Sequence, residues 1–167
     1  MFIEMKVAGI TLDPMTKMPI VILKDGSGEN ALPIWIGIAE ASAIATQLEK
    51  IDLARPMTHD LLRNVLNELD VNLEKVEVTD LKDNTYFAVL HLKVGDETLP
   101  VDSRPSDAIA LALRTESPIF VHEEVLNKSR HIDSSKAEEG MVTPEDRDKW
   151  TEILENLSAE AFGKYKM

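Results

Sequence analysis

An internal repeat is the feature of this sequence that most restricts its fold. The tripeptide at residues 32–34 aligns with the one at residues 99–101, and the flanking segments match at the same spacing without a gap. An alanine-rich segment follows each tripeptide, with Glu40 in the first copy where Asp107 stands in the second. Because the apolar pattern, the turn and the acidic residue agree together, we predict that two copies of one structural unit build the fold.

Each copy has the pattern of a three-stranded β-meander followed by a helix. Alternating β-branched and polar residues, interrupted by Gly and Asp, indicate antiparallel strands joined by tight turns. The pattern then changes to Ala, Ile and Leu at helical spacing. The first copy predicts strands at 7–12, 20–23 and 32–34 and a helix at 40–51; the second predicts strands at 76–80, 86–92 and 99–101 and a helix at 106–114. These duplicated units predict an α+β domain in which helices pack against a mainly antiparallel sheet.

The chain divides into one domain and a C-terminal appendage. We expect the domain at residues 1–127 (repeat halves at about 1–52 and 70–116, linking helix at 58–69), a polar linker at 128–142 and the appendage at 143–167. The appendage begins with a strong helix start and continues with apolar residues at i, i+3, i+4 and i+7, which predicts an amphipathic helix. The sequence leaves open whether this helix packs on the domain, on a partner or on another subunit.

Composition excludes several classes of site. The 167 residues contain no cysteine, so disulfides, thiolate zinc sites, iron–sulfur clusters and cysteine nucleophiles are excluded. Asp and Glu number 30 against 18 Lys and Arg, and the net charge of −12 argues against tight electrostatic binding of nucleic acid or of anionic membranes. No apolar run approaches the roughly 20 residues that span a bilayer, and no signal peptide is visible. We therefore expect a cytoplasmic protein that does not bind membranes.

Charged residues gather at the starts of the predicted helices. If the two copies pack about a pseudo-twofold axis, these helix starts converge in one pocket. Carboxylates there would bind Mg²⁺ or Mn²⁺ through hard oxygen ligands, guanidinium groups would contact phosphate, and an imidazole would transfer a proton. The predicted metal ligands are Asp102, Asp107, Asp60 and Glu40, the predicted phosphate contacts are Arg55 and Arg104, and the predicted proton carrier is His59.

A purely structural role explains the same residues. Acids in the first turn of a helix interact favourably with the helix dipole, by about 0.3–1 kcal/mol each. Arg104 and Asp107 lie three residues apart and can simply pair with each other. An Arg-Pro sequence can merely end an extended segment. The sequence leaves both interpretations open.

Ordered blocks of the sequence resemble the bifunctional nuclease domain family. They are LPIWIG at 32–37 with EA at 40–41, RPMTHDLL at 55–62, DSRPSDAIALA at 102–112 and PIFV at 118–121. The resemblance covers roughly residues 1–130. It implies cleavage of RNA and DNA, the activity described for the plant members that give the family its name. It carries over no catalytic assignment, so the cluster at the helix starts is inferred from the residues alone.

Two functions of different classes follow. The first is a nuclease that hydrolyses phosphodiester bonds in RNA or DNA with low sequence selectivity, using a divalent cation and no organic cofactor. At a net charge of −12, nucleic acid would be a weakly and non-specifically bound substrate. The alternative is a non-enzymatic binding or regulatory module that uses the same helix starts to bind an anion or a protein. We expect a homo-oligomer.

Overall fold

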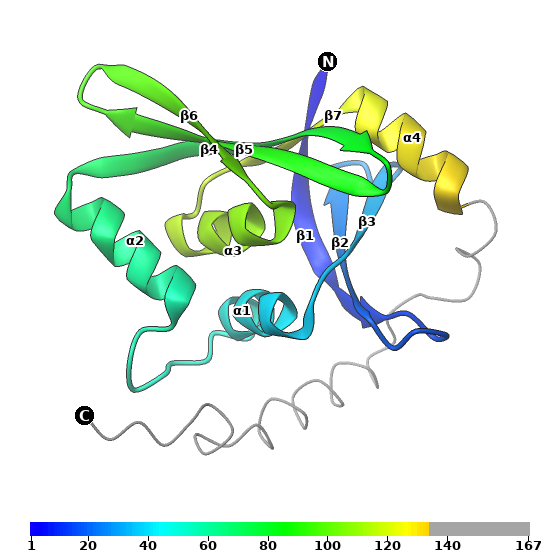
Figure 1. Cartoon of the computed structure of the whole chain (residues 1–167), viewed down its shortest axis with the longest axis horizontal. Helices are drawn as coiled ribbons and strands as arrows, with labels where there is room; N and C mark the ends of the chain where they lie inside the picture. Colours follow the sequence, from blue (N-terminus) through cyan, green and yellow to red (C-terminus); the bar gives the residue numbers. More distant parts are fainter. Residues whose placement is uncertain (134–167) are drawn as a thin grey trace.

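A seven-stranded sheet and four helices make up residues 1–133, which are the residues that the computed structural model describes. The strands are β1 (Phe2–Leu12), β2 (Pro19–Asp25), β3 (Ala31–Trp35), β4 (Val71–Lys82), β5 (Thr85–Val94), β6 (Glu97–Ser103) and β7 (Ile119–His122). The helices are α1 (Ile38–Leu48), α2 (Thr58–Glu68), α3 (Pro105–Thr115) and α4 (Glu123–Asp133). The predicted α+β class is confirmed (Figure 1).

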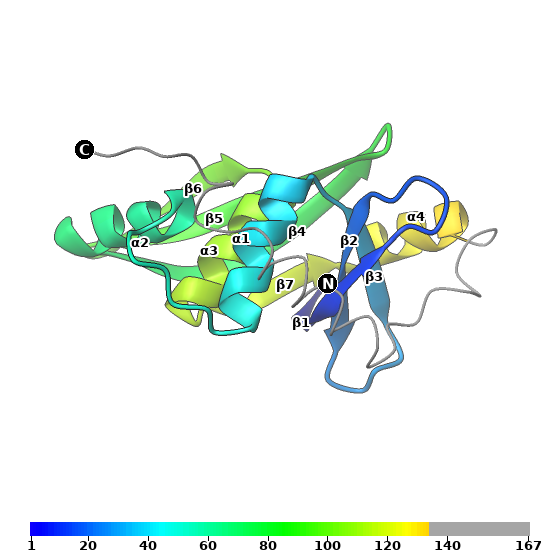
Figure 2. The ribbon, with the colours of Figure 1, turned by 90° about the horizontal axis from the view of Figure 1, so that it is seen from below.

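The sheet is twisted and almost entirely antiparallel. Its strand order is β3-β2-β1-β7-β4-β5-β6, so β7 separates two meanders, and the pairing of β4 with β7 is parallel. Helix α3 contacts both α1 and α2 and lies between them on one face of the sheet (Figures 1 and 2). The core forms between this layer and the sheet and is aliphatic; its fully buried side chains include Leu23, Leu32, Ile44, Val76, Val78, Ile109 and Leu111.

The two meander–helix units have the order that the repeat predicts. Helices α1 and α3 are both eleven residues long, and they begin at Ile38 and Pro105, the same spacing that aligns the two tripeptides. Each helix follows a three-stranded meander, and the two meanders flank β7. Descent of the two units from one duplicated ancestor stays a prediction.

Helix α4 extends into the segment expected as a linker. Its side chains Val125, Leu126 and Ser129 are buried, and Lys128 Nζ bonds to Asp80 Oδ1 of β4 at 2.7 Å. The segment from residue 128 is predicted to be a linker because it is mostly polar. In the structure α4 continues through Asp133, and a few buried side chains and the Lys128–Asp80 hydrogen bond anchor this helix to the sheet. The rest of the predicted linker and the predicted C-terminal helix at 143–167 lie outside the described residues.

None of the helices within residues 1–133 has the length and apolar character needed to cross a membrane.

Candidate functional site

Four polar side chains, three of them charged, meet where helices α1, α2 and α3 begin. Arg104, the N-cap of α3, donates from Nε to Asp107 Oδ2 at 2.7 Å and from Nη1 to Glu40 Oε1 at 3.0 Å. His59 Nε2 lies 2.9 Å from Asp107 Oδ1. Glu40 belongs to the first turn of α1, and Asp107 to the first turn of α3. We call Glu40, His59, Arg104 and Asp107 the helix-start cluster.

Local sequence explains how each helix start presents its side chain. Pro105 is the first residue of α3, and Arg104 before it is extended, with φ −70° and ψ 143°, as a residue that precedes proline favours. The Arg104 side chain can therefore fold back onto Asp107, three residues later. In α2, the backbone N–H of Met57 donates to Asp60 Oδ2 at 2.9 Å. This cap fixes the first turn of α2, in which His59 faces α3.

Asp107 is the centre of the cluster. Its carboxylate accepts hydrogen bonds from Arg104 Nε and Nη2 and lies within hydrogen-bond distance of His59. Burial by itself would raise the pKa of Asp107, but the bonds from Arg104 and His59 outweigh it and hold the pKa below its usual range. Asp107 is therefore a carboxylate at neutral pH, and it can orient the imidazole of His59.

The second ring nitrogen of His59 faces solvent. Among the side chains that the structure describes, those of residues 1–129, every buried nitrogen or oxygen has a hydrogen-bond partner. His59 Nδ1 makes no hydrogen bond to another described residue, and the His59 side chain is 14% exposed, so water can reach the ring. When Nε2–H donates to Asp107, Nδ1 carries the lone pair and can accept a proton. The cluster thus contains an oriented base beside an exposed guanidinium.

Glycine at position 37 makes room for Glu40. A Cβ atom at Gly37 would lie 2.2 Å from Glu40 Oε2, so the Glu40 side chain folds back over the glycine. In the repeat, Gly37 aligns with Arg104, and both residues are N-caps. One arginine consequently contacts the acids of both repeat units, Glu40 and Asp107. The repeat alignment contained this signal, but only the structure shows the contact.

Asp60 does not join the cluster. It turns toward the far end of α3, where Arg114 Nε donates to Asp60 Oδ1 at 2.6 Å and Arg114 Nη1 donates to the Ala110 carbonyl at 2.8 Å. The Arg114 side chain is only 2% exposed. Burial alone would raise the pKa of Asp60, but the bonds from Arg114 and from the Met57 N–H outweigh it and lower the pKa. The sequence shows no signal for this ion pair, because its members lie on different helices.

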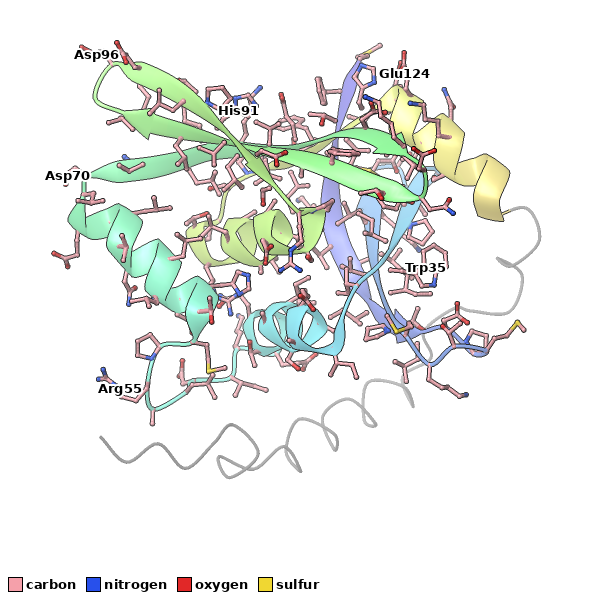
Figure 3. All side chains as sticks on the ribbon, in the orientation of Figure 1. Trp35, Arg55, Asp70, His91, Asp96 and Glu124 are labelled. Atoms are coloured by element: carbon pink, nitrogen blue, oxygen red, sulfur yellow. The ribbon has the colours of Figure 1, made fainter. Side chains whose placement is uncertain are left out.

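Two other predicted site residues also lie apart from the cluster. Asp102 pairs with Val89 in the β5–β6 ladder, while the next pair along, Val101 and Leu90, lies on the face that α3 covers. Since side chains alternate along a strand, Asp102 is on the opposite face of the sheet. Arg55 is exposed in the segment before α2 and points away from the body of the molecule (Figure 3).

The predicted four-carboxylate metal site is not assembled. Glu40 and Asp107 meet at Arg104, whose positive charge stands where a cation would bind, Asp60 is paired with Arg114, and Asp102 is on the other face of the sheet. The side chains that the structure describes include no group of three or more His, Cys, Asp or Glu placed to share a metal ion. Glu40 and Asp107 do come together at the helix starts, as expected, but both carboxylates form ion pairs with Arg104.

Comparison with known proteins identifies the family. The bifunctional nuclease domain matches residues 21–134. The chain belongs to the bifunctional nuclease domain family. An uncharacterized protein of Mycobacterium tuberculosis, Rv1829, is 36% identical over 162 residues, which are 95% of this chain and 97% of that protein.

Plant members of the bifunctional nuclease domain family are also similar. Bifunctional nuclease 2 of Arabidopsis thaliana is 31% identical over 122 residues, covering 70% of this chain and 37% of the plant protein. Bifunctional nuclease 1 of the same plant is 33% identical over 109 residues, covering 62% of this chain and 33% of its own length. The similarity to the plant nucleases therefore covers about a third of each of them, and the helix-start cluster lies inside the family match.

Proposed function

We propose that this chain is a nuclease that hydrolyses phosphodiester bonds in RNA or DNA at the helix-start cluster. The observation that carries the proposal is the His59–Asp107–Arg104 arrangement inside the family's domain. An oriented imidazole and a guanidinium side by side are the groups that proton transfer and phosphate binding need. No base-reading element is part of the proposal, so we expect low sequence selectivity.

In the proposed reaction, His59 accepts a proton and Arg104 binds the phosphate. His59 Nδ1 takes a proton from the attacking water as the water oxygen bonds to phosphorus and the phosphorus–oxygen bond opposite it breaks. The departing oxygen takes a proton from solvent, and the imidazolium then releases its proton to solvent. Asp107 stabilises the imidazolium. Arg104 has five N–H donors, of which three bond to Glu40 and Asp107, so two remain for phosphoryl oxygens. Its side chain is 66% exposed and accessible to a polymer.

The four predicted ligands do not surround one position, so together they could not hold a divalent cation. A requirement for Mg²⁺ or Mn²⁺ stays a prediction from the sequence, and the proposed reaction uses only protein side chains. The net charge of −12 supports weak binding of nucleic acid, because few basic side chains are available to replace the counterions of the phosphates.

The substitution Asp107→Asn tests the proposal, with Asp102→Asn as its matched control. Asp107→Asn keeps the shape of the side chain but removes the charge that orients His59, and we expect cleavage to fall by about 10³- to 10⁴-fold. Asp102→Asn removes an exposed carboxylate on the other face of the sheet and should leave cleavage unchanged. The measurement is the rate at which the purified full chain cleaves labelled RNA and DNA, in Mg²⁺, in Mn²⁺ and in EDTA.

Equal rates for wild type and Asp107→Asn would refute the proposed site and would point to a contaminating nuclease. Binding of nucleic acid without any cleavage would favour the alternative, a regulatory module that binds an anion at the same cluster.

Substitutions that release Arg104 from Glu40 should strengthen nucleic-acid binding. Gly37→Ala places a Cβ where Glu40 Oε2 lies, and the flexible carboxylate must move away from Arg104. Gly37 has φ −74° and ψ 166°, which alanine adopts without strain. Since an exposed ion pair contributes about 0.2–1 kcal/mol, we expect affinity for a single-stranded oligonucleotide to rise by up to about fivefold. Glu40→Gln should act in the same direction, and weaker binding by both variants would contradict this role of Glu40.

A further inference from the structure

Helix α2 packs with its polar side toward the molecule. His59 and Asp60 reach α3 through Asp107 and Arg114, whereas no residue of α2 is buried. Most apolar residues of α2 face outward: Leu61, Leu62, Val65 and Leu69 after its last turn are 55%, 40%, 44% and 66% exposed. The exception is Leu66, which is half-buried and packs against the core. An amphipathic helix normally packs the other way round, with its apolar side on the core. The outward side of α2 therefore has the character of a binding surface.

The exposed apolar residues form one stripe with apolar neighbours around it. Leu61, Val65 and Leu69 follow one another at four-residue spacing, so they line one side of α2 over its whole length. Further exposed apolar side chains belong to the segment before α2 and to β6; they are Ile51, Leu53, Met57, Leu99 and Val101. The exposed residues of 51–69 supply the central part of such a surface, since a stable interface takes roughly 20–30 residues from each partner.

We propose that this α2 surface binds the α2 surface of a second copy of the chain, with the two helices antiparallel. A twofold axis beside Val65 places Leu61 of each copy against Leu69 of the other, because both lie four residues from Val65. Apolar side chains of one copy then face apolar side chains of the other along the whole contact. This pairing is isologous, so it closes as a dimer and leaves no stripe exposed.

Charge at the two ends of α2 selects the antiparallel direction. Arg55 precedes the helix and Asp70 follows it, so the two residues mark opposite ends of α2 (Figure 3). Neither Arg55 nor the acids Glu68 and Asp70 form an ion pair within residues 1–133. An antiparallel pair brings Arg55 of one copy to the Glu68–Asp70 end of the other, which is also the negative end of that helix dipole. A parallel pair would place like charges together.

A single cysteine tests the register. The chain contains no cysteine, so Val65→Cys introduces one thiol per copy, beside the proposed axis. Oxidation of the full chain should give a disulfide-linked dimer on a non-reducing gel, because the two sulfurs come within bonding distance. The matched control is Met15→Cys, at a side chain that is 83% exposed in the turn between β1 and β2 and should remain monomeric on the gel. Equal cross-linking of the two variants would overturn the proposal.

Sedimentation of the full chain provides the second test. The wild type should sediment as a dimer, and Leu61→Lys with Leu69→Lys should weaken dimerisation by at least about tenfold. Arg55→Glu and the pair Glu68→Lys with Asp70→Lys should each weaken it as well. Mixing these two charge variants should restore a dimer, because every contact then joins opposite charges. A monomeric wild type would overturn the proposal, whether the C-terminal segment or another protein covers the stripe. None of these readouts depends on nuclease activity.

Discussion

The substitution His59→Ala is expected to reduce phosphodiester cleavage by about 10²- to 10⁴-fold, the usual contribution of a positioned general base. His59 is the imidazole of the helix-start cluster, and its Nδ1 is accessible to water while Asp107 holds Nε2. The fold should survive, because the substitution removes one hydrogen bond to a carboxylate, worth about 1.5–3 kcal/mol. The measurement is the cleavage rate of labelled RNA and DNA, together with the thermal unfolding midpoint.

His91→Ala is the matched control for this substitution. His91 Nε2 lies 2.8 Å from Glu77 Oε2, so the chain has a second histidine–carboxylate pair of similar geometry on other elements, β5 and β4 (Figure 3). Among the described residues no arginine donates to Glu77, whose other partner is Lys75. We expect His91→Ala to cost similar stability and to leave cleavage intact. A similar loss of cleavage in both variants would mean that His59 acts only through the fold.

The largest effect on stability is expected for Arg114→Ala. This substitution leaves the Asp60 carboxylate without its guanidinium and removes the bond to the Ala110 carbonyl. Breaking a buried pair from one side costs about 3–5 kcal/mol, and the 20% exposure of Asp60 puts the expected loss near 3 kcal/mol. For a domain of this size, the unfolding midpoint should fall by roughly 10 °C. Chemical and thermal unfolding of the full chain provide the measurement.

The pH dependence distinguishes this ion pair from simple loss of packing. The pKa of Asp60 is lowered in the folded state, so its contribution is present above the unfolded value near 3.8 and is lost as the pH falls through the folded pKa. The difference in the free energy of unfolding between wild type and Arg114→Ala should therefore become smaller at acidic pH. The control Arg63→Ala removes a half-buried arginine whose hydrogen bonds among the described residues go to neighbouring Asn64. Its charge lowers the pKa of Asp60 less than Arg114 does, so the substitution should have a small effect. If the stability lost in Arg114→Ala stayed constant down to pH 2, the loss would come from packing of the Arg114 side chain and not from its charge.

Most of the fold could be predicted from local patterns. The alternation of β-branched residues located the meanders, and the repeat located α1 and α3, because a strand and a helix each leave a period in the sequence. Helix α4 escaped prediction since its burial depends on β3, β4 and β7, which are distant in the chain. The outward orientation of Leu61, Val65 and Leu69 on α2 could not be predicted, because helical periodicity does not say which side of a helix faces the rest of the molecule.

The amino-acid sequence by itself determined the α+β class, the family resemblance and which charged residues stand at helix starts. Only the tertiary structure decided which of those charges meet. The position of a side chain at a helix start is set by a few neighbouring residues, such as Pro105 for Arg104. Its partner is set by how α1 and α2 pack on α3, and each guanidinium pairs with the carboxylates that this packing brings within reach. For this reason Asp107 and Glu40 meet Arg104, Asp60 meets Arg114, and Asp102 stays on the far face of the sheet.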